Sequence, residues 1–182
     1  YHIFPNAGDG GLPTGAALTA YQHESEDFSP FDLDDVYLGP SIRDGLIEDL
    51  TKRKLPYEEP DDVIKRAVDL LAEGNIVAWC QGRMEYGPRA LGNRSILINP
   101  TESDSMDRVN KSVKFRESWR PFAPSMTEEV YGEYLVDPVY DPYMITSFDV
   151  KQDKRGEIPA VTHVDGTTRP QEVRKSVNPR YW

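Results

Sequence analysis

The sequence has little cysteine and no long apolar run. Cys80 is its one cysteine, so no disulfide forms within the chain, and the apolar residues around it predict a buried, reduced thiol. No apolar run approaches the roughly 20 residues of a membrane-spanning helix. The first residues also lack the basic-then-apolar order of a signal peptide. We therefore expect a cytoplasmic protein without a membrane partner.

Motifs of several enzyme classes are also missing. There is no Gly-x-x-x-x-Gly-Lys-Ser/Thr phosphate loop, no His-Glu-x-x-His zinc motif and no Gly-x-Ser-x-Gly nucleophile elbow. Positive charge is in deficit, because 21 Lys and Arg face 31 Asp and Glu, for a formal net charge of -10. A net negative charge repels polyanions at long range, so nonspecific binding of nucleic acid is disfavoured.

Periodic apolar segments are present and predict a mixture of helices and strands. Pro60 and the two aspartates after it start a helix that Gly74 ends. Because helices and strands intermix without strict alternation, we expect an α/β or α+β sheet domain over residues 60–182. The expected helices cover residues 14–21, 41–50, 63–71, 105–114 and 127–134, and the expected strands cover 75–80, 95–98, 143–148 and 160–164.

The first basic segment, residues 82–95, lies between two predicted strands and contains Arg83, Arg89 and Arg94 among three glycines and a proline. Guanidinium groups match phosphate oxygens in pairs, and glycines let backbone N–H groups approach the same anion. The segment predicts a phosphate clamp. A solvated loop with incidental arginines is the alternative.

The second basic segment alternates charge with aromatic residues, and Lys111, Lys114, Arg116 and Arg120 are its cations. This alternation is also typical of platforms for single-stranded nucleic acid. The acidic remainder of the chain favours a pocket for one compact, charged ligand instead. A helix end neutralised by Glu117 is the alternative without a ligand.

The third segment, residues 162–169, carries His163 and Arg169. His163 is a candidate proton carrier or phosphate donor, with a structural hydrogen-bonding role as the alternative. Arg169 is a candidate anion ligand. Three basic segments in an acidic chain fit convergence on a polyphosphate, whose transition states carry charge on several oxygens.

These segments resemble the signature blocks of the C-terminal region of the O-carbamoyltransferases that act on nodulation factors and antibiotics. Residues 6–11 resemble the closing motif of that family's N-terminal Kae1-like domain, which has an actin-type fold. The resemblance implies a chain truncated at both ends and an isolated chain with weak or no adenylation activity. The implied parts are the end of a Kae1-like domain (1–22), a linker (23–59) and most of a YrdC-like domain with a twisted mixed sheet (60–182).

The resemblance also implies the chemistry. The YrdC-like domain of such enzymes combines carbamoyl phosphate with ATP and Mg²⁺ to give carbamoyl adenylate and pyrophosphate. The Kae1-like domain, with an iron-type divalent metal, then transfers the carbamoyl group to a hydroxyl of a sugar or natural product. Arg89, Arg94, Lys114, Arg116, Arg120 and Arg169 are the implied ligands of ATP and carbamoyl phosphate; Lys114, Arg120, Arg169 and His163 are the implied catalytic residues.

Asp9 is the implied metal ligand. His2 and His23 lack the His-x-x-x-His spacing of the partner ligands, so we expect no complete metal site in this chain. Two other functions remain open. One is an enzyme that resembles threonylcarbamoyl-adenylate synthase, and the other is a non-catalytic module that binds a nucleotide or RNA.

Overall fold

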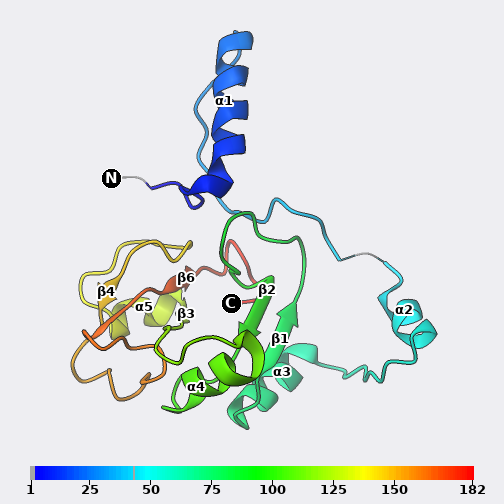
Figure 1. Ribbon diagram of the computed structural model, residues 1–182, viewed down its shortest axis with the longest axis vertical. Helices are drawn as coiled ribbons and strands as arrows, with labels where there is room; N and C mark the ends of the chain where they lie inside the picture. Colours follow the sequence, from blue (N-terminus) through cyan, green and yellow to red (C-terminus); the bar gives the residue numbers. More distant parts are fainter. Residues whose placement is uncertain (1–2, 43) are drawn as a thin grey trace.

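The computed structural model describes residues 3–42 and 44–182, and their fold is α+β, as the sequence predicts (Figure 1). The resemblance implies one twisted mixed sheet, whereas the described strands pair two by two, β1 with β2 and β4 with β5 antiparallel, and β3 with β6 parallel. The α-helices of this part are α1 (Leu12–Glu24), α2 (Leu46–Lys52), α3 (Val63–Ala72), α4 (Ser105–Val109) and α5 (Glu128–Tyr134), and the strands are β1 (Val77–Cys80), β2 (Arg94–Leu97), β3 (Ser125–Thr127), β4 (Phe148–Asp149), β5 (Thr167–Thr168) and β6 (Gln171–Val173).

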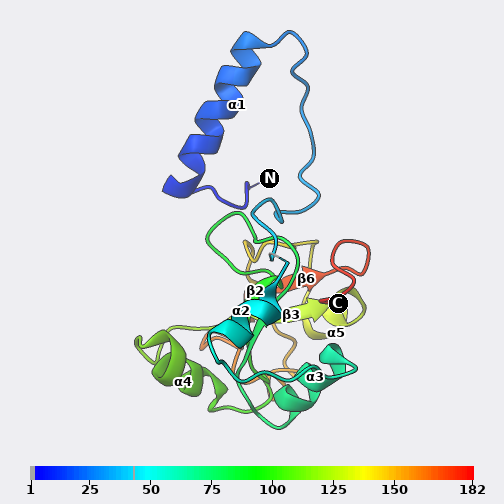
Figure 2. The same ribbon diagram turned by 90° about the vertical axis from the view of Figure 1, so that its right-hand side faces the viewer.

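The helix α1 extends away from the rest of the chain in both views (Figures 1 and 2). It follows a short 3₁₀ turn, Asp9–Gly11, and a proline occupies its first turn, where a missing N–H costs nothing. None of its residues is buried. The predicted helix is thus confirmed, while the Kae1-like origin of this segment and the bounds of the three predicted parts stay predictions.

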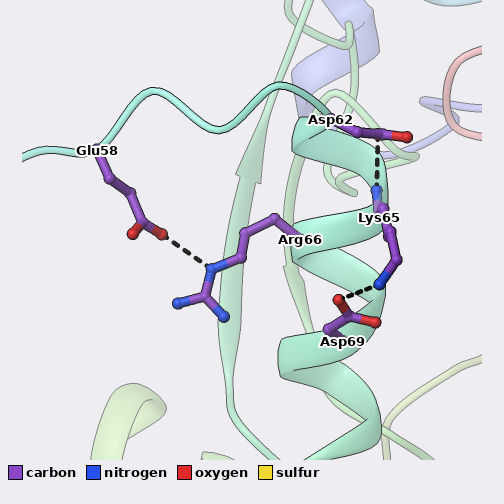
Figure 3. A network of polar contacts seen from close by, with 5 residues as sticks. All are labelled: Glu58, Asp62, Lys65, Arg66 and Asp69. Carbon is purple, nitrogen blue, oxygen red and sulfur yellow. Dashed lines mark hydrogen bonds and ion pairs between the residues drawn. The ribbon is translucent and has the colours of Figure 1, made fainter.

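The helix α3 begins at the start signal predicted for it. The side chain of Asp62 accepts a hydrogen bond from the backbone N–H of Lys65 at 2.9 Å and so caps the first turn. Lys65 pairs with Asp69 at 2.6 Å, and Arg66 pairs with Glu58 at 2.9 Å (Figure 3). Both ion pairs are exposed, so water screens them and they add little to the free energy of folding.

The hairpin of β1 and β2 supports the first basic segment, because residues 81–93 connect the two strands. Val77 pairs with Leu97 and Cys80 with Arg94. Side chains alternate between half-buried and exposed along β1, as they do on a strand with one covered face. Cys80 falls on the exposed face, so the predicted burial of its thiol is wrong.

The helix α4 continues directly into a π-helical turn, Asn110–Lys114, so the predicted helix over 105–114 is confirmed. The turn ends at Phe115, whose φ of 47° lies in the left-handed region that bulky residues rarely adopt. A π-helical turn often marks a functional site. Here the turn contains Lys111 and Lys114, the first two cations of the second basic segment.

Two predicted strands are wrong. In 143–148 only Phe148 is in a strand, because the buried carboxylate of Asp141 accepts the backbone N–H groups of Tyr143, Ile145 and Thr146 at 2.9, 2.8 and 2.5 Å. Those N–H groups are therefore not available for hydrogen bonds to a neighbouring strand. Residues 160–164 form turns, and the strand β5 starts three residues later.

Two apolar clusters form the core of the described residues. The larger one packs α5 against the segments around β3 and β4, and it contains Met126, Tyr131, Leu135, Phe148, Val150, Ile158 and Val161. The smaller one joins Val36, from the predicted linker, to Leu91 and Met144. Val36 is 1% exposed, so this part of the linker is packed on the domain that carries the basic segments. Within the described part, no helix is long and apolar enough to cross a bilayer.

Candidate anion-binding site

The first basic segment folds around its own carboxylate. Glu85 is 7% exposed, and its Oε1 accepts the backbone N–H groups of Leu91, Asn93 and Arg94 at 2.7, 2.7 and 3.1 Å. Three convergent N–H groups form the kind of backbone concavity that binds anions. In this loop the side chain of Glu85 occupies them, so these three N–H groups are not open to an external phosphate.

Arg94 is bound by the loop that carries it. Its Nη1 donates to the carbonyl oxygens of Gln81 and Asn93 at 2.5 and 2.8 Å, and its Nη2 donates to that of Gly82 at 3.2 Å. The guanidinium therefore stabilises the loop backbone. Its predicted role as a phosphate ligand stays a prediction, and these contacts give the side chain a structural role as well.

Arg89 and Arg169 are 80 positions apart in the sequence, yet the fold brings them near enough for their charges to interact. Burial lowers the pKa of the Arg169 guanidinium, the positive charge of Arg89 lowers it further, and Asp141 raises it. The Nε of Arg169 is buried and has no hydrogen-bond partner among the described residues. A half-buried cation with a neighbouring like charge and an unused donor is unfavourable in itself, and an anion that binds both side chains removes the cost.

A buried network of polar side chains is hydrogen-bonded to the loop that carries Arg89. Gln81 donates to Asn93 and Asn178 at 2.9 and 2.8 Å, and Asn178 in turn donates to the hydroxyl of Tyr37 at 2.9 Å. The Tyr37 hydroxyl donates to the carbonyl oxygen of Leu91 at 2.9 Å. This network ties together the predicted linker, the first basic segment and the end of the chain.

Gly92 lies where the loop meets the end of the chain. Its φ is 105°, and a Cβ at this position would collide with the ring of Tyr181. Both the backbone conformation and the contact therefore require glycine. The hydroxyl of Tyr181 bonds to that of Ser125 in β3 at 2.8 Å, so the ring joins the loop to a second sheet.

The second basic segment is organised by Asn110, which is fully buried. Its Nδ2 donates to the carbonyl oxygens of Ser118 and Arg120 at 3.3 and 3.1 Å, and its Oδ1 accepts the Nε–H of Arg116 at 2.7 Å. Arg116 also stacks over the ring of Phe122 at 4.6 Å. One asparagine side chain thus holds a loop of about ten residues, and Arg116 is part of that support.

Lys114 and Arg120 point into solvent from this loop. Lys114 is exposed, and its ammonium makes no hydrogen bond or ion pair within residues 3–42 and 44–182. Arg120 is exposed too, and its one ion pair among these residues is with Glu117 at 4.0 Å. Both cations are thus available to a ligand.

His163 takes part in the turn before β5. Its Nδ1 lies 3.1 Å from the hydroxyl of Thr167, and its backbone N–H donates to the Thr167 carbonyl at 2.8 Å. Asp165 accepts the backbone N–H and the hydroxyl of Thr167, which lowers the pKa of its carboxyl. These contacts give the histidine a hydrogen-bonding role in the turn, and its catalytic role stays a prediction.

Asp9 lies in the 3₁₀ turn before α1. No three His, Cys, Asp or Glu side chains of the described residues cluster around it or elsewhere as metal ligands would. His2 lies outside the described residues. One carboxylate is too few ligands for an iron-type metal, so the described residues do not form the metal site that the resemblance implies.

An apolar cavity of about 310 Å³ lies next to the second basic segment. Phe122, Ser125 and Tyr181 are among its lining residues, and none of the lining residues is charged. A phosphate group would lose its hydration there without gaining a cation. We therefore place the candidate anion site at Arg89 and Arg169 and not in this cavity.

The fold thus brings Arg89 and Arg169 within range of each other's charge and binds Arg94 and Arg116 to their own loops. Lys114 and Arg120 are exposed, and Arg120 has an ion pair with Glu117. Sequence reasoning missed the two buried side chains that organise these loops, Glu85 and Asn110. Both are polar residues within segments that are expected to turn, which was the available signal. The sequence does not reveal that their side chains are buried.

Family comparison identifies the class of this chain. The family described as "Carbamoyltransferase C-terminus" matches residues 68–182, which is more than half of the chain and includes all three basic segments. The chain therefore belongs to the carbamoyltransferase family, in the C-terminal region of that family. The resemblance drawn from the three basic segments is confirmed.

Curated relatives agree with this assignment. Nodulation protein NolO of Bradyrhizobium diazoefficiens is 40% identical over 99% of this chain and 34% of its own length. Nodulation protein NolNO of Sinorhizobium fredii is 42% identical over 99% of this chain and 28% of its own length. The 3'-hydroxymethylcephem-O-carbamoyltransferase of Streptomyces clavuligerus is 47% identical over 60% of this chain and 20% of its own length. The chain spans about a third, or less, of each relative.

Proposed function

We propose that this chain is the adenylate-forming part of an ATP-dependent O-carbamoyltransferase of the cytoplasm. The observation that carries the proposal is the pairing of Arg89 with Arg169, inside the region that matches the family. Two guanidinium groups whose charges interact, one of them with a buried Nε–H that has no partner among the described residues, suit a ligand with several anionic oxygens. Carbamoyl phosphate and the phosphates of ATP are such ligands.

The proposed reaction needs control of charge above all. Water first cleaves carbamoyl phosphate into carbamate and phosphate. A carbamate oxygen then attacks the α-phosphorus of ATP, and the bond between the α- and β-phosphates breaks to give carbamoyl adenylate and pyrophosphate. ATP enters with Mg²⁺, which keeps several of its waters and binds phosphate oxygens of the nucleotide. Arg89 and Arg169 neutralise one anion so that the second can approach, and Lys114 and Arg120 hold the departing pyrophosphate. Positioning and electrostatics suffice, so no covalent enzyme intermediate is needed.

The carbamoyl group would then pass to a hydroxyl of a small molecule, such as a sugar or a natural product. The name of 3'-hydroxymethylcephem-O-carbamoyltransferase specifies a hydroxymethyl acceptor for that relative. Since this chain covers only part of each relative, the acceptor and the metal that supports transfer belong to the proposal for the whole natural protein. We assign no residue of this chain to the acceptor.

The test is exchange of labelled pyrophosphate into ATP by the natural protein that contains this chain. The proposal predicts exchange that depends on carbamoyl phosphate and that falls when Arg89 or Arg169 is replaced by alanine. Exchange that depends on bicarbonate and threonine would instead identify the enzyme that resembles threonylcarbamoyl-adenylate synthase. ATP binding without exchange would identify a non-catalytic binding module, and either result would overturn the proposal.

A further inference from the structure

Glu85 has an unusual place for an acidic residue in a site that binds anions. Its carboxylate is buried in the loop of Arg89, and it has no ion pair with Lys, Arg or His in the described part of the chain. Three backbone N–H groups bind it instead, at 2.7, 2.7 and 3.1 Å. A buried carboxylate is costly unless such donors satisfy it, so its presence calls for a specific role.

Leu91 is hydrogen-bonded both to Glu85 and to the segment that follows Arg169. The N–H of Leu91 donates to Glu85, and its carbonyl oxygen accepts the side-chain amide of Gln171 at 3.0 Å. Arg89 lies two residues before Leu91, and Arg169 lies two residues before Gln171. One residue with both peptide groups engaged thus connects the Arg89 loop to the segment of Arg169.

The alternative role for these N–H groups is direct phosphate binding, as in glycine-rich phosphate loops. In this loop the carboxylate already satisfies them and repels an external anion from the backbone. Selectivity is thereby left to the arginine side chains, which bind oxygens in pairs.

We propose that Glu85 is a positioning residue that sets the separation and orientation of the Arg89–Arg169 pair through Leu91. This inference rests on the proposed function only in that the pair binds a phosphate-containing anion. Glu85 does not contact the ligand. It acts by holding the loop in the one arrangement in which both guanidinium groups face a shared anion.

A double-mutant cycle tests this inference in the natural protein that contains the chain. Pyrophosphate affinity is measured by calorimetric titration for the wild type, Glu85→Gln, Arg89→Ala and the double variant. Glutamine keeps the size of the side chain and removes its charge. We expect Glu85→Gln to weaken pyrophosphate binding about tenfold when Arg89 is present and to have no further effect when Arg89 is alanine.

An equal loss in both backgrounds would mean that Glu85 only maintains the fold, and an unchanged affinity with Arg89 present would mean that it does not position the pair. Either result overturns the inference. Glu85→Asp, which keeps the charge and shortens the side chain, is measured in the same cycle. If Glu85→Gln does not fold, the Asp variant decides by the same criterion.

The readout also separates this inference from the proposed function. Non-additive pyrophosphate binding without carbamoyl-phosphate-dependent exchange leaves Glu85 as the positioning residue of a different anion site. Unchanged pyrophosphate affinity in Arg89→Ala removes the anion site itself, and the inference fails with it.

Discussion

The side-chain amide of Gln171 donates a hydrogen bond to the carbonyl oxygen of Leu91 at 3.0 Å, across 80 positions of sequence. Gln171 is 3% exposed and Leu91 is also 3% exposed, so water does not compete for the bond. This contact connects the loop of Arg89 to the start of β6, which follows Arg169. The geometry of the anion site thus depends on a buried long-range contact rather than on either loop alone.

Replacing Arg89 or Arg169 by alanine will weaken pyrophosphate binding by about tenfold to a hundredfold, because each removes a charge-assisted contact worth about 1.5–3 kcal/mol. Arg89→Ala will not lower the free energy of unfolding, since it also relieves repulsion on Arg169. Calorimetric titration and chemical denaturation measure the two effects. Arg66→Ala, at an exposed ion pair on α3, is the control and will leave the affinity unchanged.

Lys114→Ala will lower the rate of pyrophosphate exchange by about a hundredfold, because a preorganised cation stabilises the negative charge that develops in the transition state by about that factor. Its stability will stay within about 0.5 kcal/mol of the wild type, as expected for an exposed side chain. The matched control is Lys111→Ala. Lys111 lies in the same π-helical turn but pairs with Asp107 at 3.5 Å. Equal exchange rates in the two variants would show that Lys114 does not contact the phosphates.

Gly92→Ala will destabilise the protein by about 2 kcal/mol or more, because its φ of 105° is strained for alanine and the new methyl group would meet the Tyr181 ring. Gly132→Ala is the opposite case. Gly132 lies in α5 with open space around its Cα, so alanine there should stabilise the helix by about 0.5–1 kcal/mol. Denaturant titration of both variants checks the signs, and equal effects would contradict the loop conformation.

The hydroxyl of Tyr37 makes stability depend on pH in the alkaline range. Burial raises its pKa from 10.0 to about 12 in the folded protein. Because the unfolded chain releases this proton first, the contribution of Tyr37 is fully present below pH 10 and is lost as the pH rises through 12. The free energy of unfolding of the wild type should therefore fall more steeply over this range than that of Tyr37→Phe. Parallel curves would show that the hydroxyl is not buried.

Local patterns in the sequence predicted most helices, because their signals lie within a few residues. Asp62 at the start of α3 and Gly74 after its end are examples, and both serve as expected. The strand expected at 143–148 failed for a reason that is also physical. Its composition favours a strand, but Asp141 binds the N–H groups that a ladder would need. Composition does not reveal that competition.

The candidate site was predictable only in part. The interaction between Arg89 and Arg169 links two of the three basic segments that were expected to converge. Convergence of the second segment, and the role of the pair in binding, stay predictions. The binding of Arg94 by carbonyl oxygens and the organising roles of Glu85 and Asn110 could not be read from the sequence. Those contacts depend on which polar atoms the folded loops bury, and residue spacing does not determine burial.

The most direct test of the central claim is a crystal structure of the natural protein that contains this chain, with carbamoyl phosphate bound. The account predicts phosphate oxygens within hydrogen-bonding distance of the guanidinium groups of both Arg89 and Arg169, with the Nε of Arg169 as one of the donors. A ligand bound at another place, with the two arginines in contact only with solvent, would contradict it.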